Sequence, residues 1–129
     1  MPRTIRIAAA LLLSGERTLL VRKRGTTTFM QPGGKIEPGE TAEAALRREL
    51  HEELGLTVAP GAARYLGQFT AIAANEPDAV VVAELFELHA AGPVHPAAEI
   101  EEIRWIDAGT SDIELAPLTR DHVLPAWRR

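Results

Sequence analysis

The sequence predicts an α/β domain in which helices cover the faces of a mixed β-sheet. The chain has 129 residues, 46% of them hydrophobic and 25% charged, which is typical of one globular domain with its own core. Strand-like segments lie before and after one strongly helical segment. Because the chain shows no internal repeat, low-complexity tract or linker, we expect residues 1–129 to form a single domain.

The first part of the chain is predicted to form a β-hairpin followed by a loop. Residues 5–13 are continuously apolar, as in a central strand that is covered on both faces. Residues 14–16 supply the turn, and residues 18–24 return as a second strand. Residues 25–34 are rich in Thr, Gly and Pro, so they predict a loop, with a short strand near Phe29.

The middle of the chain predicts a helix with a defined start and end. Residues 42–54 contain strong helix formers and neither Gly nor Pro. Thr41 is suited to the N-cap, and Gly55 to the left-handed conformation that ends many helices. After this helix we expect two strands joined by a turn, a third strand and a terminal helix, at residues 63–73, 79–89, 100–106 and 118–127.

Charge and composition exclude several classes of partner. Fourteen basic and eighteen acidic residues give a formal net charge of −4, whereas binding to nucleic acid or to an anionic membrane requires a basic surface. The absence of cysteine excludes a disulfide framework and a thiolate metal site, and it fits a cytoplasmic location. The apolar run 7–13 is too short to cross a bilayer, and no small-x-small cleavage site follows it, so we interpret it as a buried strand and not as a signal peptide.

The predicted helix carries an acidic face. Glu49, Glu52 and Glu53 are spaced i, i+3, i+4, so they share one side of the helix, next to a leucine stripe that must face the sheet. Like charges at this spacing repel one another, and a bound cation would neutralise them. Oxygen ligands suit Mg²⁺ or Mn²⁺ better than zinc. A solvated helix face would also be glutamate-rich, and the helix alone does not exclude that interpretation.

The loop before the helix favours the metal site. Glycines in the run 32–34 allow the backbone to approach a ligand closely, and their carbonyl groups are hard oxygen donors. Lys35 follows, where its ammonium group could meet a phosphate. This is not a Walker-type loop, because the lysine follows two adjacent glycines and no Ser or Thr comes next.

At these residues the chain resembles the Nudix hydrolases, in particular the MutT-like members. Their signature is Gly, five residues, Glu, seven residues, Arg-Glu, an aliphatic, any residue, Glu-Glu, any residue, Gly, an aliphatic. Residues 34–56 follow it without a departure, and the predicted order of strands around this segment is also similar. The matching residues are Gly34, Glu40, Arg48, Glu49, Leu50, Glu52, Glu53, Gly55 and Leu56.

The resemblance implies a fold, a reaction and a set of metal ligands. The implied fold is an α/β/α sandwich around a mixed sheet. The implied reaction is hydrolysis of a pyrophosphate bond in a nucleoside di- or triphosphate-linked substrate, with Mg²⁺ or Mn²⁺ as the cofactor. By position, Glu49, Glu52 and Glu53 are the expected metal-binding and catalytic carboxylates, and a carbonyl group of Gly33 or Gly34 is expected to complete the metal's ligands.

Two further roles follow from the same resemblance. Arg48 and Glu40 are expected to form the ion pair that steadies the loop against the helix. In many members a glutamate from a later loop binds metal or acts as the general base, and Glu99 lies where mutator-type members carry it. Glu101 and Glu102 are close competitors for that role.

The remaining candidates concern substrate binding. Alternation along the second strand places Arg22 and Arg24 on one face and Lys23 on the other. Arg22 and Arg24 are either phosphate contacts or an ordinary basic strand end. Phe29 and Asn75 could contact a base or a sugar, although a hairpin residue such as Asn75 would also be explained by the turn alone.

The sequence favours an enzyme over a binding module. Nudix-like domains that bind nucleotides or regulators without catalysis often lose glutamates of the signature, and this chain keeps all of them. Marks of the ADP-ribose and dinucleoside polyphosphate hydrolases are missing, since Ile72, Ala73 and Ala74 occupy those positions. A mutator-type hydrolase of small nucleotides is therefore the default expectation. Many members are homodimers, and nothing in the sequence selects for or against a homodimer.

Overall fold

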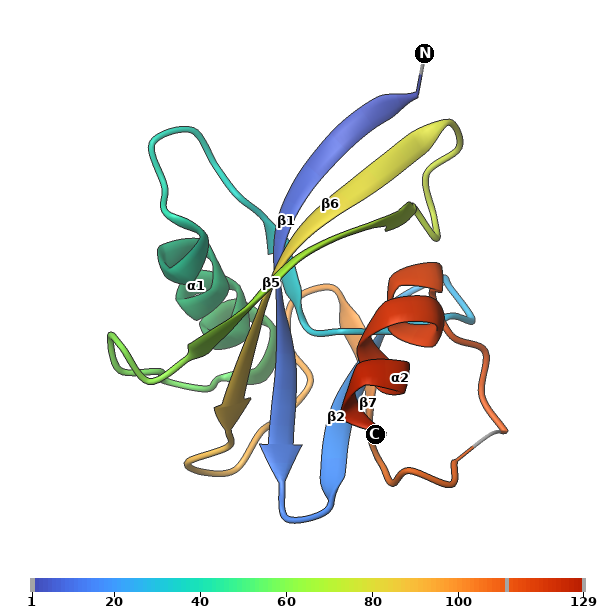
Figure 1. Cartoon of the computed structure of the whole chain (residues 1–129). Helices are drawn as coiled ribbons and strands as arrows, with labels where there is room; N and C mark the ends of the chain where they lie inside the picture. The colour runs from blue at the N-terminus through green and yellow to red at the C-terminus, as the bar shows by residue number, and fades with distance from the viewer. Residues whose placement is uncertain (1, 111, 129) are drawn as a thin grey trace.

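The structure, a computed structural model, describes residues 2–110 and 112–128. Within these residues a mixed sheet separates α1 from the C-terminal helical segment (Figure 1). The elements are β1 (Arg3–Ser14), β2 (Arg17–Lys23), β3 (Phe29–Met30), β4 (Gly33–Lys35), α1 (Ala42–Leu54), β5 (Arg64–Ile72), β6 (Ala79–His89), β7 (Ile100–Ile106), a π-helical turn (Thr119–Val123) and α2 (Leu124–Trp127).

The sheet divides where β1 and β2 separate. Its order is β3-β2-β1-β6-β5, and β1 runs parallel to β6 from Arg3↔Ala79 to Leu13↔His89. In contrast, β1 and β2 pair only at Leu13↔Thr18 and Ser14↔Arg17, next to their turn. Beyond that point β4 pairs with β1, and β7 pairs with β2. The divergence leaves room in the middle of the domain, beside the N-terminal end of β4.

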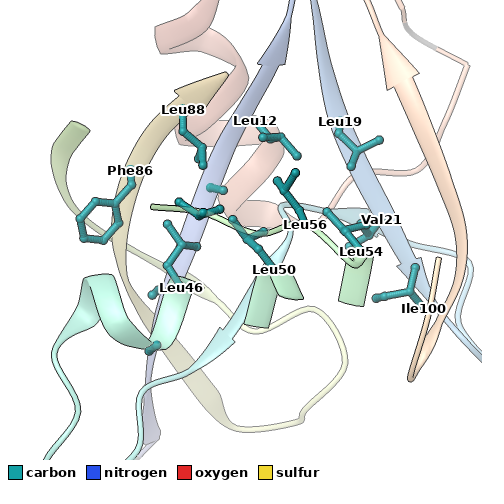
Figure 2. Close-up of a cluster of buried hydrophobic side chains, with 14 residues drawn as sticks. Leu12, Leu19, Val21, Leu46, Leu50, Leu54, Leu56, Phe86, Leu88 and Ile100 are labelled. Carbon is teal, nitrogen blue, oxygen red and sulfur yellow. The ribbon is translucent and has the colours of Figure 1, made fainter. Parts of the chain in front are cut away.

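Strand β1 is covered on both faces, as its continuous apolar sequence predicts. Because side chains alternate along a strand, Ala8, Ala10 and Leu12 pack with the leucines of α1, whereas Ala9 and Leu11 pack on the opposite face with residues of the C-terminal segment. Figure 2 shows the first of these clusters, in which leucines of α1 approach side chains of the sheet. This packing fixes the rotation of α1 about its axis.

The structure confirms the predicted α/β class and places helical layers on both sides of a mixed sheet. The predicted bounds of α1, β6 and β7 are confirmed, and those of β1, β2 and β5 agree to within two residues. Two predictions need correction. Gly33 and Gly34, expected in a loop, form strand β4 by pairing with β1, and the terminal helix begins as a π-helical turn. No helix among the described residues is long and apolar enough to cross a membrane.

Candidate active site

Helix α1 is placed by its ends and by its leucines. The hydroxyl of Thr41 accepts a hydrogen bond from the Ala44 N–H at 3.1 Å, and Gly55 closes the helix in the left-handed conformation at φ 68°. Leu46, Leu50 and Leu54 are fully buried against the sheet. The neighbouring side of the helix, which carries Glu49 and Glu53, is thereby turned toward strand β4.

Glu53 is a carboxylate held almost entirely away from water. Its side chain is in the interior, with 2% of the residue exposed, and Oε1 accepts a hydrogen bond from the Gly33 N–H at 3.1 Å. Burial raises the pKa of Glu53 to about 8, the repulsion from Glu49 and Glu99 adds to this, and the bond from Gly33 opposes it. The group therefore needs a compensating positive charge to ionise at neutral pH.

Glu49 lies directly against Gly34. A Cβ at position 34 would be only 2.4 Å from the Glu49 carboxyl carbon, so the missing side chain is what leaves space for this carboxylate. At Gly33 a Cβ would meet the backbone oxygen of Ala8 at 2.1 Å, and the φ of 142° also requires glycine. Burial raises the pKa of Glu49, although the neighbouring Arg48 works against the shift.

The predicted ion pair of Arg48 and Glu40 is present and forms part of a larger network. Nε and Nη2 of Arg48 donate to the two oxygens of Glu40 at 2.8 and 2.9 Å, and Nη1 donates to Glu49 at 2.8 Å. Nη2 also donates to the carbonyl oxygen of Lys35. The bonds from Arg48 and from the Glu37 N–H lower the pKa of Glu40 to about 2. Arg48 therefore joins the loop, strand β4 and the helix.

A cavity of about 450 Å³ opens beside these groups. It brings together residues of β1, β2, β4, α1, the loop after β5, the loop before β7 and the C-terminal segment. The predicted site residues among its lining are Gly33, Gly34, Lys35, Glu49, Glu53, Asn75 and Glu99. Three of the predicted carboxylates and a lysine therefore meet the glycine backbone at one shared space, which sequence spacing alone could not establish.

The cavity separates Glu99 from its two competitors. Glu99 lines it and lies 3.5 Å from the ammonium group of Lys23. Glu101 and Glu102 instead pair with Arg24 and Arg22, at 3.2 and 3.0 Å. Neither Glu101 nor Glu102 lines the cavity. The geometry thus favours Glu99 for a role in the cavity.

Three of the predicted substrate contacts lie elsewhere. Arg22 and Arg24 form the two ion pairs just described and do not line the cavity. Phe29, 6% exposed, packs with Leu20 and Leu124 in a hydrophobic cluster. Its backbone bridges the C-terminal segment, which draws the ring into the core. Strand β2 ends at Lys23 and its register with β7 shifts between Arg22 and Lys23, so Arg24 lies beyond the strand, and Lys23 is the basic residue of β2 that lines the cavity.

Glu52 also differs from expectation in its position. Its side chain is 53% exposed and lies 3.9 Å from Arg48, and it borders a groove on the far side of α1. Within the described part of the chain, no three acidic or histidine side chains are gathered closely enough to form a ready-made metal site. A divalent ion would have to draw Glu49, Glu52 and Glu53 together.

The residues present nevertheless fit a hard divalent cation. The donors are carboxylates and backbone carbonyl groups, with no thiolate in the chain. Burial raises the pKa values of two of the carboxylates, Glu49 and Glu53, and it does so in Glu49 despite the opposing effect of Arg48, so a cation in the cavity would favour their ionised forms. The missing side chain of Gly34 leaves space next to the Glu49 carboxylate. Glu49, Glu53 and Glu52 are the side chains that would hold the ion.

Several lining residues belong to no pattern that can be recognised in the sequence. Alternation predicts Lys23 on the face opposite to Arg22 and Arg24, and Gln31, Leu118 and Thr119 belong to no recognisable motif. Gln31 lies in the linker between β3 and β4, and Thr119 begins the π-helical turn. Only the tertiary contact between these segments places them in the cavity.

The fold and the site identify the class. The family model of the NUDIX domain matches residues 3–126, and the chain belongs to this family. Over 60 residues, 43% of this chain and 46% of the relative, it is 37% identical to the 8-oxo-dGTP diphosphatase of Escherichia coli (strain K12). It is 38% identical over 52 residues to the RNA pyrophosphohydrolase of Legionella pneumophila (strain Corby), which is 40% of this chain and 30% of that protein. The matches thus span less than half of these relatives.

Solved structures show the same fold over almost the whole chain. The MutT NUDIX hydrolase from Burkholderia pseudomallei superposes with a TM-score of 0.76 at 23% identity, covering 98% of this chain and 96% of that one. The MutT protein from Methanosarcina mazei Go1 gives a TM-score of 0.77 at 23% identity, with 98% and 94% covered. At this identity the likeness establishes the fold, which agrees with the predicted α/β/α sandwich.

Proposed function

We propose that the protein hydrolyses a pyrophosphate bond in a small nucleotide with Mg²⁺ or Mn²⁺ as its cofactor. The observation that carries the proposal is the meeting of Glu49, Glu53 and Glu99 with the Gly33–Gly34 backbone around one cavity. Its volume of about 450 Å³ is in the range of small-molecule sites. The names of the two curated relatives, a diphosphatase and a pyrophosphohydrolase, support the same reaction class.

The charges of the cavity suit a polyphosphate chain. Bound Mg²⁺ or Mn²⁺ would offset the negative charges of the phosphates and lower the pKa of a coordinated water. Glu49, Glu52 and Glu53 would hold the ion, and Arg48 would keep Glu49 in place through its 2.8 Å bond. Lys35, which is 66% exposed in its side chain, and Lys23 are the cations that could contact the phosphates.

Glu99 is our candidate for the general base. It lies on a loop outside the metal-binding helix, its side chain is 56% exposed, and it faces the same cavity as Glu53. A carboxylate in this position can take a proton from the attacking water while the helix carboxylates hold the ion. Its ion pair with Lys23 orients the side chain without removing it from water.

The names of the relatives and the missing subfamily marks support a proposal for the substrate class. We infer a nucleoside triphosphate or a nucleoside diphosphate linked to another group. The protein that matches over the longest stretch reported above acts, by its name, on 8-oxo-dGTP. We propose a cytoplasmic housekeeping role, and a homodimer remains compatible with it.

The test is hydrolysis of a panel of nucleotides, sugar nucleotides and dinucleotides, measured as phosphate or pyrophosphate release with Mg²⁺ and with EDTA. We expect release from at least one nucleotide only when the metal is present. Glu99→Gln should lower kcat at least about tenfold, as expected for loss of general-base catalysis. Glu101→Gln is the matched control: it breaks an exposed ion pair outside the cavity and should change kcat less than twofold.

The alternative is a module that binds nucleotides without hydrolysing them. Binding of nucleotides with no release of product from any member of the panel, with or without metal, would support that alternative and contradict the proposal. Equal effects of Glu99→Gln and Glu101→Gln would leave the reaction in place but remove Glu99 from it.

A further inference from the structure

The turn between β5 and β6 carries a carboxylate that contacts cations from two other strands. This turn, residues 73–78, lies at the same end of the sheet as the N-terminus (Figure 1). Oε2 of Glu76 accepts a hydrogen bond from Nη2 of Arg3 at 2.5 Å, and Oε1 lies 3.8 Å from Nζ of Lys35. Arg3 is the first residue of β1 and Lys35 is the last residue of β4. Glu76 therefore connects the turn to both strands.

The two contacts of Glu76 are of different kinds. The contact with Arg3 is a charge-assisted hydrogen bond. The distance of 3.8 Å to Lys35 is too long for a hydrogen bond, and the side chains of Lys35 and Glu76 are 66% and 37% exposed. An ion pair that is this open to water is weak and is screened by salt. Another anion can therefore displace Glu76 from Lys35 while Arg3 still holds the carboxylate.

The backbone is held in place on both sides of this ion pair. The Arg3 N–H donates to the carbonyl oxygen of Asp78 at 2.8 Å, which keeps the turn against β1. Lys35 pairs with Ile7, and its carbonyl oxygen accepts a hydrogen bond from Arg48. The flexible side chain of Lys35 can thus move its ammonium group between two anions without a shift of either strand.

Both members of the ion pair line the cavity. Residues 72–76 form one part of its lining, and Lys35 follows the glycine backbone that lies beside Glu49 and Glu53. Because Lys35 and Glu76 are partly exposed, a ligand in the cavity has access to them. A phosphate group that enters can therefore meet the same ammonium group that Glu76 contacts.

We propose that Glu76 competes with the phosphate groups of the ligand for Lys35. Its carboxylate contacts the ammonium group in the free protein, a phosphate displaces it, and it returns when the product leaves. The proposal rests on the proposed nucleotide hydrolysis for the identity of the ligand. Glu76 is thus a positioning residue that acts through Lys35. Since product release limits turnover in many enzymes, a carboxylate that weakens a phosphate contact favours the departure of the product.

The test measures binding of imidodiphosphate, in which a nitrogen atom bridges the two phosphorus atoms and no pyrophosphate bond can be cleaved. Calorimetric titration in the presence of Mg²⁺ gives its Kd for the wild type and for Glu76→Gln. We expect Glu76→Gln to bind it about threefold more tightly, because the competing charge is lost from an exposed ion pair.

Glu37→Gln is the matched control for a general effect of charge. Glu37 also lines the cavity, and its side chain is 65% exposed, but its carboxylate lies 3.9 Å from Arg48. The substitution removes the same charge from the same cavity, and we expect it to change the Kd by less than about 1.5-fold. Equal gains in affinity from Glu76→Gln and Glu37→Gln would overturn the proposal.

Variants of Lys35 test whether Glu76 acts through this residue. In Lys35→Gln the further change Glu76→Gln should alter the Kd by less than about 1.5-fold, because no ammonium group is left to compete for. In Lys35→Arg, which keeps the charge, the gain of about threefold should be retained. A gain of the same size in Lys35→Gln would overturn the proposal, as would equal affinity of the wild type and Glu76→Gln or the absence of binding by both.

Failure of this proposal and failure of the hydrolase proposal give different results. A protein that cleaves a nucleotide but binds imidodiphosphate equally well with and without Glu76 would keep its proposed reaction and lose the competition. A protein that hydrolyses nothing but gains affinity in Glu76→Gln only when residue 35 is cationic would keep the competition and lose the reaction.

Discussion

Among the residues that the structure describes, two glutamates are buried, and their surroundings are opposite. Glu84 on β6 is 7% exposed, and its carboxylate accepts hydrogen bonds from Tyr65 at 2.7 Å, Gln68 at 2.8 Å and Arg6 at 3.4 Å. These donors lower its pKa, with Gln68 contributing most. Glu53 on α1 is 2% exposed and receives one bond, from the Gly33 N–H, while burial raises its pKa to about 8.

The difference distinguishes a carboxylate whose hydrogen-bond donors lie within the protein from one that we propose to hold a metal ion. Three donors of the protein satisfy the hydrogen-bonding capacity of the Glu84 carboxylate, so its charge contributes to stability. Glu53 lines a cavity together with Glu49 and Glu99 and accepts one hydrogen bond, from Gly33. Its ionised form is therefore unfavourable in the free protein, and a bound cation would stabilise it. At similar burial, the surrounding donors therefore decide whether the pKa of a glutamate is lowered or raised.

The largest difference between the two glutamates is expected when each is replaced by glutamine, which removes its charge. Glu53→Gln should lower kcat by two orders of magnitude or more, because metal-ion catalysis supplies several kcal/mol, and it should leave the free protein at least as stable at pH 8. Glu84→Gln should leave kcat within about twofold and lower the free energy of unfolding by roughly 1–3 kcal/mol, since a charged acceptor is lost beside three donors.

Steady-state kinetics measures kcat and urea unfolding measures the free energy of unfolding, and both are carried out on the two variants. Near wild-type turnover of Glu53→Gln would remove this residue from the site. A loss of activity in Glu84→Gln as large as that in Glu53→Gln would show that the two carboxylates are not functionally distinct.

The pH dependence of stability should differ in sign for the two groups. Below pH 4.5 Glu53 is protonated in both the folded and the unfolded chain. Between about 4.5 and 8 the unfolded chain is ionised while the folded chain keeps its proton, so its contribution lowers the free energy of unfolding as pH rises. The total is a few kcal/mol, at about 1.4 kcal/mol per pKa unit. Glu84, with its lowered pKa, contributes stability that is lost as pH falls through the folded pKa.

Unfolding of the metal-free protein from pH 5 to pH 8 checks this prediction, with Glu53→Gln as the reference. The decline toward pH 8 should be smaller in the variant, and addition of Mg²⁺ to the wild type should reverse it. If the free energy of unfolding falls equally in the wild type and in Glu53→Gln, the claim that burial raises the pKa of Glu53 is contradicted.

Gly33 and Gly34, which lie beside Glu53 and Glu49, provide a further comparison. Gly33→Ala places a Cβ 2.1 Å from the backbone oxygen of Ala8 at a φ of 142°, so it should destabilise the fold by about 2–4 kcal/mol. Gly34→Ala meets only the flexible end of Glu49, which can move. It should change stability by about 1 kcal/mol or less and raise the Mg²⁺ concentration needed for half-maximal activity about tenfold. Equal destabilisation by both changes, measured by urea unfolding, would contradict this division.

The smallest effect is expected at the edge of the Glu84 cluster. Tyr65→Phe removes one of the three donors to Glu84, but Tyr65 is 54% exposed and water can replace its hydroxyl. We expect the free energy of unfolding to fall by about 1 kcal/mol or less, with kcat unchanged. Thermal unfolding together with a single activity measurement suffices, and any substantial change in kcat would connect this cluster to the site.

The sequence predicts the parts of this fold that are encoded locally. Helix α1 was predicted with its bounds because Thr41 and Gly55 cap it and no residue between them breaks it. The spacing of Glu49 and Glu53 placed both on one side of that helix. Strand β4 was missed, because Gly33 and Gly34 become a strand only through pairing with β1, and that partner lies far away in the sequence.

The site was less predictable for the same physical reason. The sequence does not show that Lys23, and not Arg22, faces the cavity, because this depends on the separation of β1 from β2 and on the shifted register between Arg22 and Lys23. Phe29, a candidate in the sequence for contact with a base or a sugar, packs in a hydrophobic cluster in the structure. Gln31 and Thr119 carry no pattern, and only the tertiary contacts of their segments place them in the cavity lining.

Binding of Mn²⁺ at pH 8 tests most directly whether the buried carboxylate of Glu53 is a ligand of a divalent cation. Paramagnetic resonance can count free Mn²⁺ in titrations of the wild type, Glu53→Gln and Glu84→Gln. We predict that the wild type and Glu84→Gln bind the ion with the same affinity, and that Glu53→Gln binds it at least tenfold more weakly. Equal binding by Glu53→Gln and the wild type would contradict the central claim.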